Sequence, residues 1–236
     1  MRLLMSKMRG AMQKYGMIKD GDKIAVGVSG GKDSVALLCA LAELRRFYPA
    51  SYSLYAFTLD PRFFGKPADY SPIKELCQRL RVPYHVECTD LWEIVFEIRK
   101  EKNPCSLCAK MRRGILHGLA KNAGCNKIAL GHHLDDAAET FYMNLLNGGK
   151  IGCFSPVSYL SRRDLTMIRP MIFAREREIV NAVSRLGLPV VKSACPVDGE
   201  TERRRVSELL SRLETDYDDL RAKTVGALQR SGIDGW

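Results

Sequence analysis

The chain has 236 residues, 46% hydrophobic and 27% charged, a composition that is typical of a folded globular protein and excludes an intrinsically disordered one. No apolar run approaches the roughly 18 residues that a membrane-spanning helix needs, and the N-terminus does not resemble a signal peptide. The net charge of +10 favours a polyanionic partner. We therefore expect a cytoplasmic protein with no membrane partner, whose eight cysteines stay reduced.

The first two thirds of the chain alternate between predicted helices and strands. Apolar spacing predicts helices at 1–20, 73–80, 106–122 and 135–146, and one more through Val35, Leu38 and Leu41. Short buried runs predict strands at 23–28, 54–59, 83–86 and 127–130. This alternation is typical of an α/β fold with a doubly wound parallel sheet, in which ligands bind beyond the carboxyl ends of the strands.

The pattern changes near residue 200. A single helical stripe follows the run Arg203–Arg205, and it contains Val206, Leu209, Leu210, Leu213, Tyr217 and Leu220. We therefore predict an α/β domain over 1–199, which includes the N-terminal helix and the cysteine site, and a C-terminal helical extension over 200–236.

A glycine-rich segment, Ser29-Gly-Gly-Lys-Asp-Ser34, joins the first predicted strand to the next helix. Glycines let backbone N–H groups approach phosphate oxygens, and the start of a helix adds a partial positive charge. Lys32 is placed to neutralise a phosphate, and Asp33 to hold Mg²⁺ or to orient the loop. The segment resembles the PP-loop of the ATP pyrophosphatases, which cleave ATP between the α- and β-phosphates. In that superfamily the end of the second strand contacts adenosine, which makes Asp60 a further candidate.

Cys105 and Cys108 have the spacing of metal ligands, and Cys195 lies far downstream in the sequence. A Cys-x-x-Cys pair alone is compatible with redox chemistry, zinc or an iron–sulfur cluster. Three thiolates are too few for a structural zinc site but suffice for a [4Fe–4S] cluster with one iron left open. Cys153 is a candidate fourth ligand. The other four cysteines, Cys39, Cys77, Cys88 and Cys125, are expected to pack as small apolar residues.

Two histidines and two aspartates follow the fourth predicted strand, in Gly131-His-His-Leu-Asp-Asp136. Adjacent side chains on extended backbone point in opposite directions, so we expect one histidine to face a ligand and the other to pack. Acidic residues in the first turn of a helix are also expected from the helix dipole alone. His85 and His117 are expected to have no catalytic role.

The chain resembles the tRNA 2-thiocytidine synthetase family over roughly residues 20–196. The resemblance lies in four segments that occur in the family's order: the PP-loop, Cys105–Gly114, Lys127–Asp136 and Ile168–Pro170. The resemblance implies a Rossmann-like PP-loop ATP pyrophosphatase fold that uses ATP, Mg²⁺ and a [4Fe–4S] cluster. It implies adenylation of a tRNA cytidine carbonyl and its replacement by sulfur. The donor would be a cysteine desulfurase or free sulfide, and a homodimer stays open.

Taken together, these expectations give four groups of candidate residues. The catalytic candidates are Lys32, Asp33, Cys105 and Cys108. The ATP-binding candidates are Ser29, Gly30, Gly31, Lys32, Asp33, Ser34, Asp60, Gly131, His132, Asp135 and Asp136. The metal-binding candidates are Cys105, Cys108 and Cys195 for the cluster and Asp33 for Mg²⁺. The RNA-binding candidates are Lys110, Arg112, Arg113 and Arg169.

Four alternatives remain open at this stage. Cys105 or Cys108 would carry a persulfide if the cluster were absent. A lysidine-type ligase would not need three cysteines, and a non-catalytic relative would bind RNA or nucleotide only. A uridine target is disfavoured because the uridine-thiolating relatives carry additional terminal cysteine pairs, whereas this chain has no cysteine before Cys39 or after Cys195.

Overall fold

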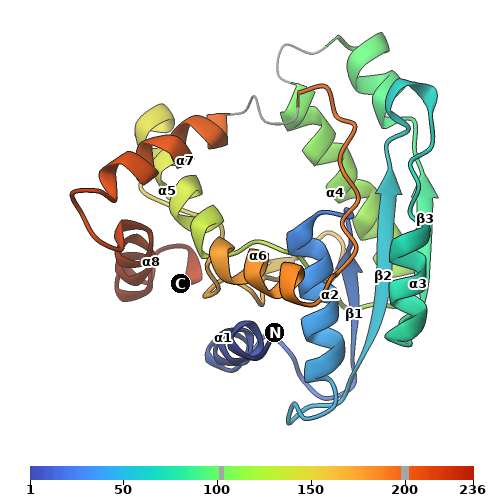
Figure 1. Ribbon diagram of the computed structural model, residues 1–236, viewed down its shortest axis with the longest axis horizontal. Helices are drawn as coiled ribbons and strands as arrows, with labels where there is room; N and C mark the ends of the chain where they lie inside the picture. Colours follow the sequence, from blue (N-terminus) through green and yellow to red (C-terminus); the bar gives the residue numbers. More distant parts are fainter. Residues whose placement is uncertain (101–103, 198–201) are drawn as a thin grey trace.

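The computed structural model describes residues 1–100, 104–197 and 202–236. Its centre is a six-stranded sheet in the order β3-β2-β1-β4-β6-β5 (Figure 1). The strands are β1 (Asp22–Gly27), β2 (Tyr52–Asp60), β3 (Tyr84–Cys88), β4 (Lys127–Ala129), β5 (Val157–Leu160) and β6 (Leu165–Ile168). Neighbouring strands are parallel except for β5, which pairs antiparallel with β6 at one edge. The predicted α/β architecture is confirmed, with this antiparallel edge as an addition.

Eight α-helices and three short helical turns accompany the sheet within the described residues. The helices are α1 (Arg2–Lys14), α2 (Lys32–Leu44), α3 (Ser71–Arg79), α4 (Pro104–Asn122), α5 (Leu134–Gly148), α6 (Glu176–Arg185), α7 (Glu202–Leu213) and α8 (Leu220–Ser231). The short turns are η1 (Phe63–Gly65), η2 (Glu93–Ile98) and η3 (Ile233–Gly235). Among the described residues, no helix is both long enough and apolar enough to cross a bilayer.

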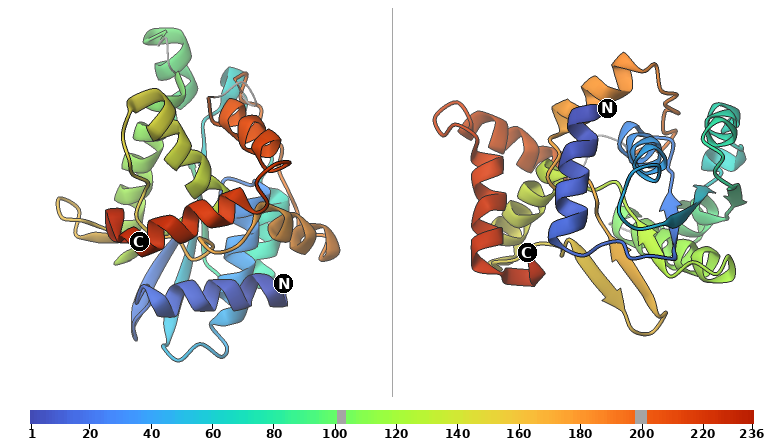
Figure 2. Two further views of the ribbon diagram at one scale, coloured as in Figure 1. Left: turned by 90° about the vertical axis from the view of Figure 1, so that its left-hand side faces the viewer. Right: turned by 90° about the horizontal axis from the view of Figure 1, so that it is seen from below.

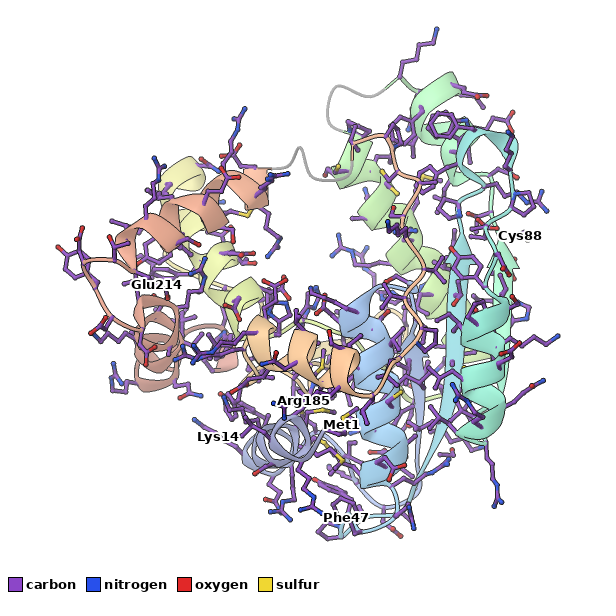
Figure 3. The ribbon with its side chains drawn as sticks, viewed as in Figure 1. Met1, Lys14, Phe47, Cys88, Arg185 and Glu214 are labelled. Carbon is purple, nitrogen blue, oxygen red and sulfur yellow. The ribbon has the colours of Figure 1, made fainter. Side chains whose placement is uncertain are left out.

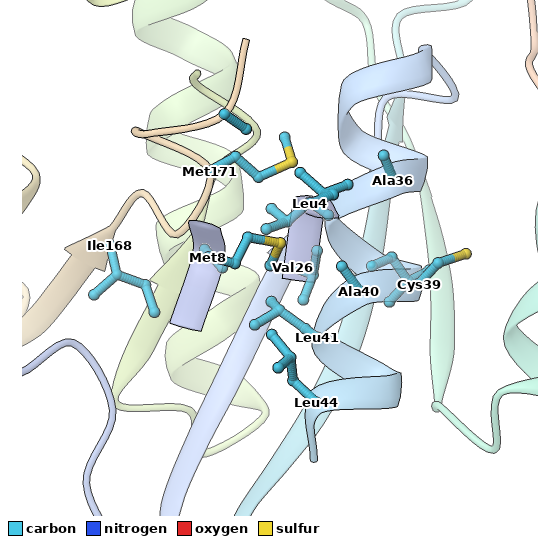
Figure 4. Close-up of a cluster of buried hydrophobic side chains, with 14 of the residues drawn as sticks. Leu4, Met8, Val26, Ala36, Cys39, Ala40, Leu41, Leu44, Ile168 and Met171 are labelled. Atoms are coloured by element: carbon cyan, nitrogen blue, oxygen red, sulfur yellow. The ribbon is translucent and has the colours of Figure 1, made fainter. Parts of the chain in front are cut away.

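Alternating side chains of β1 point into two separate apolar clusters, so the sheet is covered on both faces. Ile24 and Val26 join the larger cluster, which contains α1, α2 and α6, whereas Ala25 joins the smaller one beneath α4. Figure 4 shows Val26 among Leu4 and Met8 of α1 and the apolar face of α2. Because α2 is almost wholly buried, it is apolar all round rather than amphipathic. This packing fixes the start of α2 at the carboxyl edge of the sheet.

Three elements differ from the sequence-based expectation. The N-terminal helix ends at Lys14, since Gly16 has a φ of 55° and turns the chain toward β1. The hairpin of β5 and β6, which projects from the body in the right-hand view of Figure 2, and helix α6 were not predicted.

The expected C-terminal stripe forms two helices, α7 and α8, with Tyr217 in the turn between them. Asp219 has a left-handed φ of 56° at the end of this turn, and an ion pair between Arg221 and Glu214 holds the two helices together across it. The predicted boundary between residues 199 and 200 lies outside the described residues.

Candidate active site

The glycine-rich segment forms a turn between β1 and α2, as predicted. Gly31 is the N-cap of α2, and no side chain caps the first backbone N–H groups of that helix. The loop is braced by Ser34, whose hydroxyl accepts from the Ser29 N–H (3.1 Å) and donates to the Gly31 carbonyl (2.9 Å). Open N–H groups at a helix start attract phosphate oxygens. The local geometry therefore suits an anionic ligand.

Gly30 is held against a segment from the far end of the domain. Its φ is +88°, and a Cβ built there would lie 2.9 Å from the Cβ of Val191. The Val191 N–H donates to the Gly30 carbonyl (3.0 Å), so the chain after α6 crosses directly over the loop. Tyr70 also approaches the same glycine. Only glycine fits this position, because both the backbone angle and the space exclude a side chain.

Lys32 points its ammonium at two carboxylates. The Lys32 Nζ lies 3.0 Å from Asp33 and 2.8 Å from Glu176, the first residue of α6. Burial acts to lower the pKa of Lys32, but Glu176 and Asp33 outweigh it, so the pKa is raised. The lysine is therefore charged and available to a phosphate that displaces a carboxylate. Glu176 was not singled out from the sequence, and no motif there marked it.

Asp60 ends β2 at the same edge of the sheet, and it is 2% exposed. Its carboxylate accepts from the backbone N–H groups of Arg62 (2.9 Å) and Ala68 (3.1 Å). The side chain thus shapes the loop that follows β2. The contact with adenosine that was expected of Asp60 stays a prediction.

The three candidate cluster ligands converge. Cys105 and Cys108 lie in the first turns of α4, and the segment that follows α6 runs past the start of this helix (Figure 1). Burial raises the pKa of the Cys108 thiol, Arg112 opposes the shift, and the charges of Cys195 and Cys105 add to it. The effects on Cys108 show that both Cys105 and Cys195 lie near this residue.

The chemistry of this cysteine site fits an iron–sulfur cluster. It offers three thiols, and the buried Nε of Arg112 has no hydrogen-bond partner in the described part of the chain. Thiolates are the usual ligands of such clusters, and an unpartnered guanidinium N–H beside them suits an anionic group. In the described ranges, no three Cys, His, Asp or Glu side chains already have the arrangement of a metal site. Ligand binding therefore requires side-chain adjustment.

The other cysteines lie elsewhere. Cys153 donates its thiol to the carbonyl of Ala137 (3.3 Å), and burial raises its pKa to about 12, so it does not join the three. Cys39, Cys77 and Cys125 are buried among apolar residues, as expected. Cys88 is exposed at the end of β3, so the expectation of apolar packing is wrong for this residue.

The segment after β4 is packed against the phosphate loop. A Cβ on Gly131 would lie 3.2 Å from the backbone of Asp33, so glycine allows the close approach. His133 is the N-cap of α5 and forms a reciprocal capping box with Asp136. Its Nε2 also lies 3.8 Å from Asp33 Oδ1. Burial acts to lower the pKa of His133, but the hydrogen bond to Asp135 and the nearby carboxylates raise it overall.

The two aspartates of this segment are engaged by protein groups. Asp135 accepts from the Glu176 N–H (2.7 Å) and lies 3.7 Å from Arg221 of α8. Asp136 lies 3.2 Å from Arg203 of α7. The C-terminal helices therefore neutralise the start of α5. The predicted role of both aspartates in ATP binding stays a prediction, and the contacts of these arginines with them were not identified from the sequence.

His132 packs against an aromatic ring and an arginine. Its ring lies tilted on Phe154, with 4.9 Å between the centroids, and the Arg169 guanidinium lies 4.8 Å from the centroid of Phe154. Arg169 donates to His132 and to the carbonyl of Ser155. Because its guanidinium is 5% exposed and committed to these groups, the predicted RNA contact does not suit Arg169. Lys110 and Arg113 are exposed on α4, as an RNA contact requires.

Comparisons with known proteins identify the family of the chain. The PP-loop domain family matches residues 4–213. The tRNA-cytidine(32) 2-sulfurtransferase of Pelobacter propionicus is 42% identical over 92% of this chain and 81% of its own length. The protein of the same name from Geobacter sulfurreducens is 40% identical over 92% of this chain and 85% of its length.

Solved structures support the fold. The U34-tRNA thiolase NcsA of Methanococcus maripaludis with its [4Fe-4S] cluster superimposes with a TM-score of 0.76 at 24% identity, covering 96% of this chain and 78% of that one. An NH3-dependent NAD synthetase from Campylobacter jejuni gives a TM-score of 0.52 at 14% identity, covering 100% and 96%. Sequence, site and fold together show that this chain belongs to the PP-loop family of tRNA-cytidine 2-sulfurtransferases.

Proposed function

We propose that this protein uses ATP to replace the C2 oxygen of a tRNA cytidine with sulfur. The main support for the proposal is the course of the segment after α6. It crosses Gly30 at Val191 and reaches Cys195, near Cys108, four residues later. This segment joins a nucleotide loop and a trio of thiols in one site. The chain's net charge of +10 supports a polyanionic substrate.

The first step is adenylation of the base. The C2 carbonyl oxygen attacks the α-phosphorus of ATP, the bond to the β-phosphate breaks, and pyrophosphate leaves. The open N–H groups at the start of α2 and the charged Lys32 stabilise the phosphates as charge develops. Asp33, beside Lys32, is the residue that we propose to hold Mg²⁺. Adenylation turns a poor leaving group into AMP.

The second step forms the carbon–sulfur bond. A sulfur nucleophile attacks C2, the C2–O bond breaks, and AMP leaves with the oxygen. Cys105, Cys108 and Cys195 would hold a [4Fe–4S] cluster, which supplies an iron without a protein ligand as a position for the incoming sulfur. We propose that the sulfur comes from a cysteine desulfurase or free sulfide, and that the reaction takes place in the cytoplasm. A homodimer is part of the same proposal.

The experiment separates the two steps. Protein purified without oxygen is assayed with tRNA, ATP, Mg²⁺ and sulfide for pyrophosphate release and for thiolated nucleosides by mass spectrometry. Cys108→Ser is expected to keep pyrophosphate release and to lose thiolation and bound iron. The matched control is Cys88→Ser, which removes an exposed thiol at the end of β3.

Three outcomes contradict the proposal in different parts. Full thiolation by iron-free protein would remove the cluster from the mechanism: with sulfide as the donor it would indicate direct attack by sulfide on C2, and with a cysteine desulfurase as the donor it would favour a persulfide on Cys105 or Cys108. Unimpaired thiolation by Cys108→Ser would remove the thiols from the mechanism. An unchanged set of thionucleosides in tRNA from a deletion strain would refute the tRNA substrate.

A further inference from the structure

An aromatic cluster stands beside the cysteine site and has no role in the steps above. It combines η1, in the loop after β2, with the segment that contains η2. The Trp92 ring stacks on Phe96 at 4.7 Å with 20° between the planes, and Phe64 lies on Trp92 at 4.5 Å. Phe63 meets the edge of the same indole at 5.9 Å. We call Phe63, Phe64, Trp92 and Phe96 the aromatic platform.

The platform exposes the Phe64 ring to solvent, and the backbone that carries this ring is strained. Phe64 is 58% exposed and has a left-handed φ of 58°. Arg62, two residues earlier, is also left-handed, with a φ of 51°. Such angles are unfavourable for side chains other than glycine and persist where surrounding contacts enforce them. The buried Asp60 carboxylate enforces them here by accepting from Arg62 and Ala68.

The platform is fixed relative to the cysteine site. The Thr89 N–H donates to the Asp60 carbonyl (2.9 Å) and the Trp92 N–H to the Pro61 carbonyl (3.2 Å), which joins the two loops. η2 packs on α4, whose first turns carry Cys105 and Cys108. In Figure 1 both loops lie at the end of the sheet where α4 begins. The platform and the cysteine site therefore lie at the same end of the sheet.

Charged side chains of both signs surround the platform. The exposed cations Arg62, Lys66, Arg99 and Lys100 have no ion-pair partner within the ranges that the structure describes. Of the acidic residues nearby, Glu97 accepts from the Trp92 indole (2.8 Å) and Asp69 from the Ser71 N–H (2.8 Å). Asp90 and Glu93 are exposed. Because cations and carboxylates balance here, the exposed rings are the main argument for RNA: they offer a surface for flat bases, and the cations without an ion-pair partner can contact phosphates.

We propose that the aromatic platform binds an unpaired base of the tRNA next to the cytidine that reacts, by stacking that base on Phe64. This inference rests on the proposed function. Proteins that read single-stranded RNA stack its splayed bases on aromatic side chains. A base held there would draw the neighbouring cytidine out of the RNA loop and direct it toward the thiols.

The test measures binding of an end-labelled anticodon stem-loop RNA to the full chain by fluorescence anisotropy. Phe64→Ala is expected to weaken binding about 5- to 150-fold, the range for loss of one stacked base. Phe64→Tyr keeps the ring and should bind close to the wild-type value. A fully paired RNA hairpin of the same length should not distinguish the three proteins.

Phe47→Ala is the matched control. Phe47 is 56% exposed, nearly as much as Phe64, and it lies at the opposite end of the molecule from the end of β3 (Figure 3). Binding of the stem-loop should be unchanged in this variant. Sedimentation velocity of every variant reports folding and oligomeric state in the same samples.

Three results would overturn the proposal. Equal affinities of Phe64→Ala and wild type would exclude stacking on this ring, with the proposed function intact. A change in sedimenting mass caused by Phe64→Ala would assign the platform to contact between copies of the chain. Absence of any RNA binding by the wild type would contradict the proposed function together with the platform.

Discussion

The Arg169 Nε–H donates to Nδ1 of His132 over 3.2 Å. An imidazole nitrogen that accepts a hydrogen bond carries no proton, so the neutral ring of His132 keeps its proton on Nε2. Burial lowers the pKa of His132 to about 4, and the Arg169 charge adds to this effect while Asp136 opposes it. At neutral pH His132 is therefore an uncharged N–H donor, one residue after the glycine that packs against the phosphate loop. A neutral donor stabilises a developing oxyanion without competing for a proton.

Arg169→Met should abolish this control of the His132 tautomer. We expect His132 to exchange between tautomers and its pKa to rise, and kcat for thiolation to fall about tenfold or more with little change in the KM for ATP. The chain has four histidines, so long-range ¹H–¹⁵N correlation spectra can resolve each ring. The control is Arg185→Met, which removes an exposed arginine. An unaltered His132 spectrum would contradict the assignment.

Stability should depend on pH through His132. The unfolded chain protonates this residue near 6.5 and the folded chain only near about 4, so between these values the unfolded state binds more protons. The free energy of unfolding should therefore fall as the pH drops from 6.5 toward 4, by up to about 3 kcal/mol. His133, whose pKa is raised, acts in the opposite direction.

His132→Gln isolates this contribution. Denaturant unfolding of wild type and variant at pH 7 and pH 4.5 gives the difference in free energy of unfolding at each pH. Between pH 7 and pH 4.5 the free energy of unfolding should fall more for the wild type than for the variant. Asp136, Arg203 and Arg169 face the same ring and remain in both proteins. If the difference in stability between wild type and variant did not change with pH, His132 would be protonated equally in the folded and unfolded states.

Glu176→Gln should strengthen nucleotide binding. The Glu176 carboxylate lies 2.8 Å from Lys32 and competes with the phosphates for the same ammonium. Its partial exposure screens the pair, so we expect a gain of about 1 kcal/mol, roughly fivefold in Kd. Isothermal titration with a non-hydrolysable ATP analogue measures it, with and without Mg²⁺. Weaker binding that appears only with Mg²⁺ would instead identify Glu176 as a ligand of the ion.

Gly30→Ala should eliminate pyrophosphate release. The new Cβ would meet Val191 at 2.9 Å, and a φ of +88° is strained for alanine. Gly21→Ala is a matched control, because Gly21 has a φ of +79° but nothing within 4 Å of the added Cβ. Both variants should lose stability of about 1–3 kcal/mol from backbone strain, but only Gly30→Ala should lose activity. Equal losses of activity in the two variants would show that the Val191 contact has no specific role in pyrophosphate release.

Local sequence signals predicted the parts of the site that depend on local structure. The glycine turn, the cysteine pair and the capped start of α5 each follow from residues close together in the chain. The four predicted strands form the parallel part of the sheet with β6, because apolar runs between helices leave few other arrangements.

The parts that were missed depend on contacts between distant segments. Glu176 reaches Lys32 across 144 positions in sequence, and Arg203 and Arg221 reach the start of α5 from the C-terminal helices. Arginine side chains in a basic chain give no sign of which of them will be buried. Arg169 was assigned to RNA for this reason, and the hairpin that buries it had not been predicted.

The hydrogen bond between Val191 and Gly30 fixes one end of the short segment that leads to Cys195. Three residues, Lys192 to Ala194, separate Val191 from Cys195, and an extended chain spans at most about 3.6 Å per residue. The Cα atom of Cys195 therefore stays within about 15 Å of the Cα atom of Val191, which is bound to the phosphate loop, whatever the chain does beyond it. An insertion in these three residues would remove this limit, so the length of the segment is what keeps the third thiol near the nucleotide loop.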